Sequence, residues 1–267
     1  MKPKRPGPSS SRERVTEIFG VNPVLEALRA ATRPIQEITV ADGARDARLR
    51  DLIELARAQD IPVHHAPRTS LDRMTGNARH QGVVARVAAA RYADAESLLD
   101  SVMSRAEEVA PMFVILDGVE DPHNLGAVLR TAECAGLDGV FIPERRAAGL
   151  TDTVAKASAG AVEHVAVARV TNLSRLIDQL KERNVWVIGA AADARMNYTE
   201  WDWTRASALV MGSEGAGLHR LVRERCDALV KIPVLGHIES LNVSVATGVI
   251  LYEAVRQRAA LAKGDEE

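Results

Sequence analysis

Short apolar runs alternate with amphipathic segments along most of the chain, beginning near residue 15. Runs rich in Val, Ile and Ala are typical of strands, whereas apolar residues at helical spacing predict helices. The first helix is predicted to be capped by Asn22, with a proline in its first turn. In residues 15–90 we expect strands at 35–42, 61–66 and 80–90 and helices at 22–30 and 46–60, which together form a small α/β unit.

The alternation restarts after residues 91–110, a charged, alanine-rich stretch that we interpret as a linker running into a helix. Short apolar strands separated by helices are typical of a parallel sheet covered on both faces. In residues 111–267 we expect strands at 112–119, 138–143, 162–170, 185–190, 208–212 and 228–233, and helices at 124–136, 172–184, 218–226 and from 241 onward. Ligands of such sheets bind beyond the carboxyl ends of the strands, so the loops after Leu116, Met211 and Ile232 are the candidate sites.

Composition narrows the class of protein. The 267 residues are 46% apolar and 26% charged, which fits one large or two smaller globular domains. A net charge of −2 gives no global signal for nucleic acid, so an RNA site must be a local patch. Residues 1–14 are basic and are predicted to be a disordered tail. No secretory or membrane-spanning segment is found, so we expect a cytoplasmic protein.

The two cysteines, Cys134 and Cys226, lie in predicted helices. A disulfide framework or a zinc site needs more ligands at tighter spacing. We therefore expect two buried, reduced thiols and no metal.

The first candidate loop, "LDGVEDPHNLGAVLRTAECAG", spans residues 116–136. Asn124 is predicted to cap the helix that follows. Arg130 and Glu133 can share one helix face, and a surface ion pair accounts for Glu133. Arg130 follows the apolar run 127–129, so its charge needs a partner such as phosphate.

The second loop, "MGSEGAGL", spans residues 211–218 between a strand and a helix. Its glycines, among them Gly212 and Gly215, let backbone amides approach a ligand closely. The pattern is neither a dinucleotide-binding nor a Walker loop. Glu214 would repel a phosphate, so we expect a ligand other than a polyphosphate.

The third loop, "IPVLGHIESLNVSVATG", spans residues 232–248. From Leu241 the apolar positions Val245 and Tyr252 fall at helical spacing, so a helix is predicted to begin here and to pack behind the site. Ser240 and Asn242 then lie at its N-terminal boundary, where they can cap it. The local sequence does not decide whether Ser240 and Asn242 only cap this helix or also belong to a functional site.

Together the three loops resemble the SpoU (TrmH-like) family of RNA ribose 2′-O-methyltransferases of the SPOUT class. The family motifs are Asp-Pro-x-Asn-Leu-Gly followed by Arg, then Gly-x-Glu-Gly-x-Gly, then Ile-Pro-x-x-Gly followed by Ser-Leu-Asn-Val-Ser, and all stand here in order. The resemblance covers residues 111–259. The stretches "FGVNPVLEAL" and "HQGVVARV" resemble the family's L30e-like substrate-binding domain. The pairing looks most like the 23S rRNA guanosine-2′-O-methyltransferases that act on the peptidyl-transferase P loop.

This resemblance implies an α/β SPOUT domain, residues 111–267, with a parallel sheet and a deep trefoil knot, preceded by an L30e-like RNA-binding domain, residues 15–90. It implies a homodimer that uses S-adenosylmethionine, needs no metal and acts on RNA and not on DNA, with 23S rRNA as the expected RNA. Val234 stands where many members have Met, which alters packing only. The matching cofactor-contacting residues are Gly212, Gly215, Ile232 and Leu241, and the matching active-site residues are Asn124, Arg130, Glu214, Ser240 and Asn242.

In our interpretation Arg130 stabilises the ribose oxygen and anchors a phosphate, because a guanidinium is a poor base. Asn124 would orient Arg130 or the ribose, and Glu214 would hold polar groups of the site. Two alternatives stay open: the same chemistry on tRNA or another rRNA site, and a non-catalytic RNA-binding or ribosome-assembly protein.

Overall fold

The computed structural model describes residues 15–43, 47–106 and 109–264, so the predicted basic tail at 1–14 lies outside the described residues. The smaller unit is a mixed four-stranded sheet in the order β1-β4-β2-β3. Helices α1 and α2 pack on one face, against Ile38 and Val87 among others, and α3 covers the other face through Leu71. Its elements are β1 (Val15–Phe19), α1 (Val21–Ala30), β2 (Ile35–Ala41), α2 (Ala47–Ala58), β3 (Val63–Ala66), α3 (Arg68–Met74) and β4 (Val83–Ala88).

The N-terminus of α1 differs from the sequence-based expectation. Gly20 is the N-cap residue and makes no side-chain capping bond, while the Val21 N–H donates to Oε1 of Gln81 at 2.9 Å. The predicted Asn22 cap is therefore wrong, because a side chain 60 positions away satisfies that amide.

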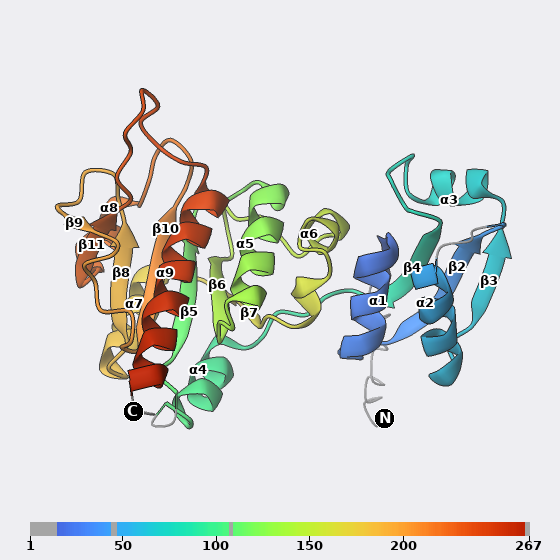
Figure 1. Ribbon diagram of the computed structural model, residues 1–267, viewed down its shortest axis with the longest axis horizontal. Coiled ribbons are helices and arrows are strands. Elements are labelled where there is room, and N and C mark those ends of the chain that lie inside the picture. Colours follow the sequence, from blue (N-terminus) through green and yellow to red (C-terminus); the bar gives the residue numbers. More distant parts are fainter. Residues whose placement is uncertain (1–14, 44–46, 107–108, 265–267) are drawn as a thin grey trace, which may run out of the picture.

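The larger unit is a seven-stranded sheet in the order β7-β6-β5-β10-β8-β11-β9, with every neighbouring pair parallel. It confirms the predicted α/β class, with a parallel sheet covered on both faces (Figure 1). Its elements are α4 (Ala95–Met103), β5 (Met112–Asp117), α5 (Pro122–Cys134), β6 (Gly139–Pro143), α6 (Asp152–Ala157), η1 (Ala161–Glu163), β7 (Val167–Val170), α7 (Leu173–Glu182), β8 (Trp186–Ala190), β9 (Met196–Asn197), β10 (Ser207–Gly212), α8 (Arg220–Arg225), β11 (Ala228–Lys231) and α9 (Val243–Gly264).

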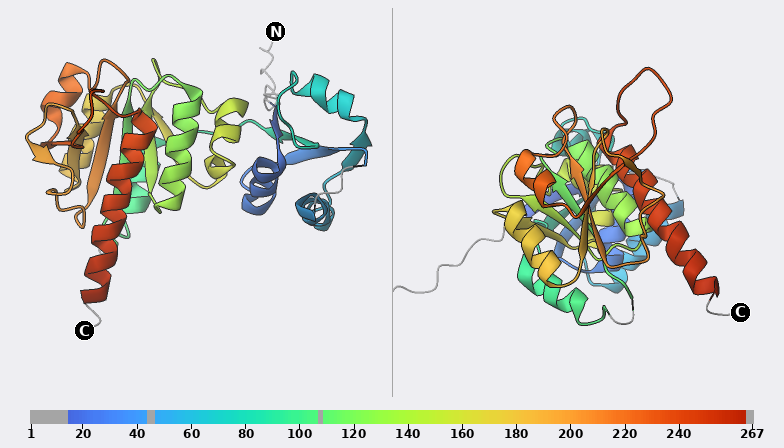
Figure 2. Two further views of the ribbon diagram at one scale, coloured as in Figure 1. Left: turned by 45° about the horizontal axis from the view of Figure 1, so that its top comes forward. Right: turned by 90° about the vertical axis from the view of Figure 1, so that its left-hand side faces the viewer.

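Alternating residues of each buried strand face the two helical layers, as a two-residue period requires. On β5, Val114 and Leu116 pack with α5 and α9, whereas Phe113 and Ile115 pack with α4, α7 and α8. Figure 2 shows α9 running across the sheet and projecting beyond it toward the C-terminus. The trefoil knot that the resemblance implies stays a prediction.

The two units meet through α6 and η1, which lie between the sheets (Figure 1). Arg33 of the smaller unit forms an ion pair with Glu163 of η1 at 2.5 Å, and their side chains are only 7% and 3% exposed. Thr32 also donates to Glu163, and Arg33 donates to the Ala88 carbonyl. Each buried charge depends on the other, so this contact ties the units together.

Candidate active site

The candidate site lies where the strand order of the larger sheet changes direction. Strand β10 lies between β5 and β8, and Gly212 at its end is the register partner of Asp117 at the end of β5. Two of the three candidate loops therefore leave the sheet side by side. Ligands of open parallel sheets bind at this kind of switch point.

One hydrogen-bond network joins residues from all three loops. Oε1 of Glu214 accepts from Nδ2 of Asn124 at 3.1 Å and from Nδ2 of Asn242 at 2.6 Å. Nδ2 of Asn242 also donates to Oδ1 of Asn124 at 3.0 Å. Asn124 is 8% exposed, whereas Glu214 and Asn242 face solvent. Residues up to 118 positions apart are thus held together at one point.

Asn124 can take part in this network because it does not cap α5. Helix α5 begins at Pro122, and Asp121 is its N-cap, accepting from the His123 N–H at 2.8 Å. The predicted Asn124 cap is therefore wrong. Pro122 in the first turn and Asp121 before it form an equally good start signal, and they place Asn124 inside the helix.

The start of α9 bears out one of its two predicted caps. Oδ1 of Asn242 accepts from the N–H groups of Ser244 at 2.9 Å and Val245 at 3.3 Å. Asn242 therefore caps the helix with its oxygen and joins the network with its nitrogen. Ser240 is exposed and makes no side-chain hydrogen bond to another described residue, so its predicted capping role is wrong.

The glycine-rich loop doubles back on itself. Ser213 and Gly217 exchange two backbone hydrogen bonds, of 3.1 and 3.0 Å. A Cβ on Gly212 would lie 2.1 Å from the carbonyl carbon of Gly217. Gly212 is thus needed for the loop itself, whereas Gly215, at φ +89° with open space beside it, leaves room for a ligand.

Arg130 projects from α5 without a partner in the described residues. Its side chain is exposed and makes neither a hydrogen bond nor an ion pair there, so a pair with Glu133 is not formed. The network accordingly does not include Arg130. An exposed guanidinium without a counter-charge is available to an anion.

The cysteine prediction is half right. Both thiols are free, but Cys134 is exposed at the end of α5 and only Cys226 is largely covered. Burial raises the pKa of the Cys226 thiol to about 12, and the neighbouring Asp227 adds to the shift. Burial and Glu133 also raise the pKa of Cys134.

Two residues of the site escaped the sequence reasoning. Asp117, 4% exposed at the end of β5, accepts from the backbone N–H of His219 at 2.7 Å and contacts its Nδ1 at 2.9 Å. A carboxylate at the last position of a buried strand was the available signal for Asp117. His219 had none, because only the fold brings it to Asp117.

The described residues contain no cluster of His, Cys, Asp and Glu side chains able to hold a metal ion. No helix in the described part of the chain has the length and apolar character needed to cross a membrane.

Comparison with known proteins adds independent findings. Residues 111–252 match the SpoU rRNA Methylase family, and residues 18–93 match a family described as RNA 2′-O ribose methyltransferase substrate binding. A Bacillus subtilis (strain 168) protein named "Putative TrmH family tRNA/rRNA methyltransferase YacO" is 47% identical over 241 residues, or 90% of this chain and 95% of that protein. A similarly named Staphylococcus haemolyticus protein is 46% identical over 90% of this chain and 95% of its own length. The crystal structure of the SpoU methyltransferase AviRb from Streptomyces viridochromogenes, in complex with the cofactor AdoMet, matches with a TM-score of 0.75 and 25% identity, covering 95% of each chain.

Proposed function

The chain belongs to the SpoU rRNA methylase family, and on that premise we propose that it methylates the ribose 2′-hydroxyl of a guanosine in 23S rRNA, in the cytoplasm and as a homodimer. The coarser activity, an RNA methyltransferase of the SpoU/TrmH family that uses S-adenosylmethionine, follows from the family and from a relative solved with that cofactor. The observation that carries the proposal is the Asn124–Glu214–Asn242 network, which unites the polar residues of three separate motifs.

The residues around the network suit S-adenosylmethionine. Gly215 has open space beside it, Leu241 is 41% exposed and Ile232 is half-buried, so these three residues are accessible to a ligand. The loop 211–218 has no Lys or Arg, and Glu214 contributes a carboxylate, which suits a cationic ligand better than a polyphosphate. When bound, the cofactor supplies an electrophilic methyl group and no metal is required.

Arg130 is assigned to the nucleotide. A ribose hydroxyl is a weak nucleophile until it loses its proton, and a guanidinium nearby stabilises the oxygen as negative charge develops. The planar group can at the same time bind the adjacent phosphate with two hydrogen bonds. Asn124 and Asn242 both bond to Glu214, and these bonds hold the loop 211–218 in place relative to α5. Ser240, exposed beside Leu241, is available for a contact with either substrate.

A homodimer is supported by apolar side chains that the described residues leave uncovered. Leu235 is 99% exposed and Ile238 77%, and on α9 Val245 and Tyr252 are 51% and 52% exposed. Of the segment 243–252, which was predicted to pack behind the site, Val243, Ile250 and Leu251 do so, whereas Val245 and Tyr252 stay exposed. Exposed apolar side chains of this kind fit a two-fold interface. Light scattering should give twice the chain mass for the wild type and a lower mass for Val245→Glu.

The smaller unit is proposed to hold the structured part of the RNA. Its match to a substrate-binding family and its buried ion pair with η1 support this role. The buried contact would set the distance between that RNA and the methyl-transfer site.

Ribose-methylation mapping of total RNA tests the proposal. Cells that lack the protein should lose one guanosine 2′-O-methylation in 23S rRNA, and the wild-type gene should restore it. Arg130→Lys keeps the charge but loses the planar fork, so it should restore the site poorly. Loss of a tRNA methylation, or of a different rRNA methylation, would identify that site as the substrate instead. If no methylation is lost, a non-catalytic RNA-binding protein is favoured.

A further inference from the structure

A cavity of about 440 Å³ opens beside the network, at the carboxyl ends of β5 and β10. Asn124 and Glu214 form part of its wall, and His219 and Arg146 face it from other loops. A cavity of this size admits a nucleoside-sized group. None of the four cofactor candidates, Gly212, Gly215, Ile232 and Leu241, lines it.

His219 is held in this wall by a buried carboxylate. Asp117 uses one oxygen for the His219 backbone N–H and the other for the ring Nδ1, at 2.7 and 2.9 Å. These are the hydrogen bonds of the Asp117 side chain, which is 5% exposed. The ring edge also lies against Gly118, where a Cβ would be 3.3 Å from Cε1. The imidazole is therefore fixed in position, although its side chain is 49% exposed.

The bond to Asp117 also determines what the other ring nitrogen can do. An ionised carboxylate only accepts hydrogen bonds, so Nδ1 carries a proton and Nε2 of the neutral ring is an acceptor. Nε2 has no hydrogen-bond partner among the described residues, and His219 is one of the residues that line the cavity. A fixed acceptor beside a nucleoside-sized space calls for a donor on the ligand.

The rest of the wall points to a base and not to a phosphate. Glu120, Asp121 and Glu214 line the same cavity with one cationic residue, Arg146, so carboxylates outnumber the positive charge and disfavour a phosphate group. Ring and exocyclic N–H groups of a base satisfy acceptors of this kind. A nucleotide whose ribose contacts the Asn124–Glu214–Asn242 network would extend its base into the cavity.

We infer that this cavity receives the base of the target nucleotide, and that His219, oriented by Asp117, accepts a hydrogen bond from a base N–H through Nε2. This assignment rests on the proposed methyltransferase function. It makes His219 a residue that recognises the substrate and Asp117 a positioning residue.

Two substitutions of His219 distinguish a hydrogen bond to the base from a purely structural role of this residue. In His219→Asn the amide nitrogen can still donate to Asp117, but nothing replaces Nε2. In His219→Gln the amide oxygen replaces Nε2 as the acceptor. Glu224→Gln, on the exposed side of the same short helix, is the control.

The probe is 23S rRNA purified from cells that lack the protein, used in methyl transfer from labelled S-adenosylmethionine and in filter binding. His219→Asn should raise KM and Kd for this RNA about tenfold, the worth of one hydrogen bond to a substrate. The variant should keep kcat within about twofold, and His219→Gln and Glu224→Gln should stay within about threefold of wild type. Kd for S-adenosylmethionine, measured by calorimetry, should not change.

The inference is overturned if His219→Asn binds the RNA like wild type, or if it weakens S-adenosylmethionine instead. An equal loss in the Asn and Gln variants together with a lowered Tm would also overturn it, since that marks a structural role. If the wild type transfers no methyl group, the proposed function fails, while filter binding still decides the role of His219.

Discussion

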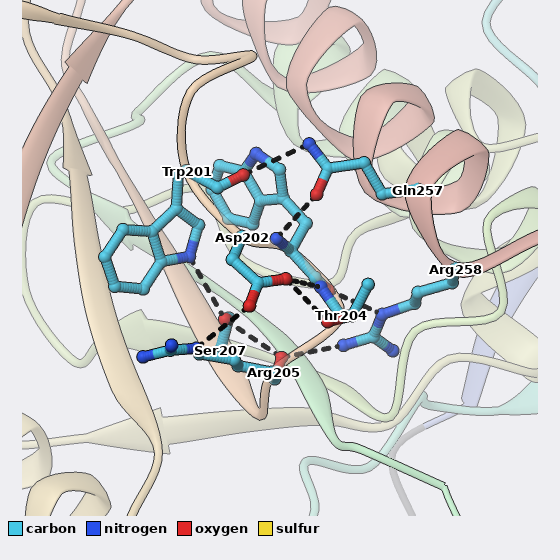
Figure 3. A network of polar contacts seen from close by, with 8 residues as sticks. Trp201, Asp202, Thr204, Arg205, Ser207, Gln257 and Arg258 are labelled. Carbon is cyan, nitrogen blue, oxygen red and sulfur yellow. Dashed lines mark hydrogen bonds and ion pairs between the residues drawn. The ribbon is translucent and has the colours of Figure 1, made fainter. Parts of the chain in front are cut away.

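Polar side chains lie at both ends of the seven-stranded sheet, and α9 extends from one end to the other. The two ends differ in whether these polar groups have hydrogen-bond partners. At the amino end, Arg258 donates to the carbonyl groups of Trp203 and Arg205, and Gln257 bonds to the backbone of residues 201 and 203 (Figure 3). Arg258 also donates to the Ala110 carbonyl. At the carboxyl end, Asn242 closes one small network, whereas Nε2 of His219 has no partner in the described residues. Arg130, further along α5, has no hydrogen-bond or ion-pair partner there either.

The difference separates a structural cluster from a binding one. At the amino end Arg258 donates to backbone carbonyl groups and the other donors bond to backbone or to neighbouring side chains, and Trp203 is completely buried. Arg258 is half-buried, and this desolvation lowers the pKa of its guanidinium. Free donors and acceptors at the carboxyl end are useful only when a ligand supplies their partners. Four changes test this comparison.

The largest effect is expected from Gly212→Val at the carboxyl end. A Cβ there would lie 2.4 Å from both the Gly217 oxygen and the Leu218 nitrogen, so the loop must open. Calorimetry should show at least a hundredfold loss of S-adenosylmethionine affinity, about 3 kcal/mol. Gly236→Ala, whose Cβ meets open space, should bind normally. Unchanged affinity in Gly212→Val would remove this loop from the site.

Arg258→Met should instead damage the fold. It strands several buried carbonyl groups at once and should cost about 3 kcal/mol of unfolding free energy. For a chain of this size the Tm should fall by about 6 to 12 °C, as calorimetry or circular dichroism would measure.

The control is Arg220→Met on α8, where the side chain is 76% exposed and pairs with Glu224, itself 54% exposed. Its Tm should change little. Folded Arg258→Met should keep its methyl-transfer rate at low temperature. A large rate loss with an unchanged Tm would reverse the roles assigned to the two ends.

A double-mutant cycle on Glu214 and Asn242 measures the small closed network. Each single change to Ala should cost about 1 kcal/mol of stability, since Asn242→Ala also removes a helix cap. Because both residues bond to each other and to Asn124, the double variant should cost less than the sum. Strict additivity in urea unfolding would show that the network is not coupled.

The smallest effect concerns the thiols. In native protein at pH 8, Cys134 should react with a disulfide reagent and Cys226 only after unfolding. The pKa of Cys226 is about 12 in the fold against 9.0 for an ordinary thiol, so the folded state holds its proton more tightly. The stability from this protonated thiol is complete below about pH 9 and is lost as pH rises toward 12. Urea unfolding at rising pH should show this loss in wild type and less of it in Cys226→Ala.

The sequence by itself determined the α/β class and most of the strands and helices. Buried parallel strands and amphipathic helices leave local patterns, and the predicted helix at 172–184 appears as α7 with Asn172 as its cap. Elements that are short or weakly patterned were missed: β1, α3, α6 and β9. The candidate site residues in the three loops also came from sequence, because the family motifs are local strings.

Only the tertiary structure decided which of these residues meet. A cap depends on backbone direction over a few residues, and Asp121 and Asn124 were equivalent candidates until the helix start was known. The bonds between Asn124, Glu214 and Asn242 depend on β10 lying beside β5, an order that no local pattern encodes. The same applies to Asp117 and His219, and to Arg33 and Glu163, which lie 102 and 130 residues apart. Local propensity specifies elements, but contacts between distant side chains are fixed only when the elements pack.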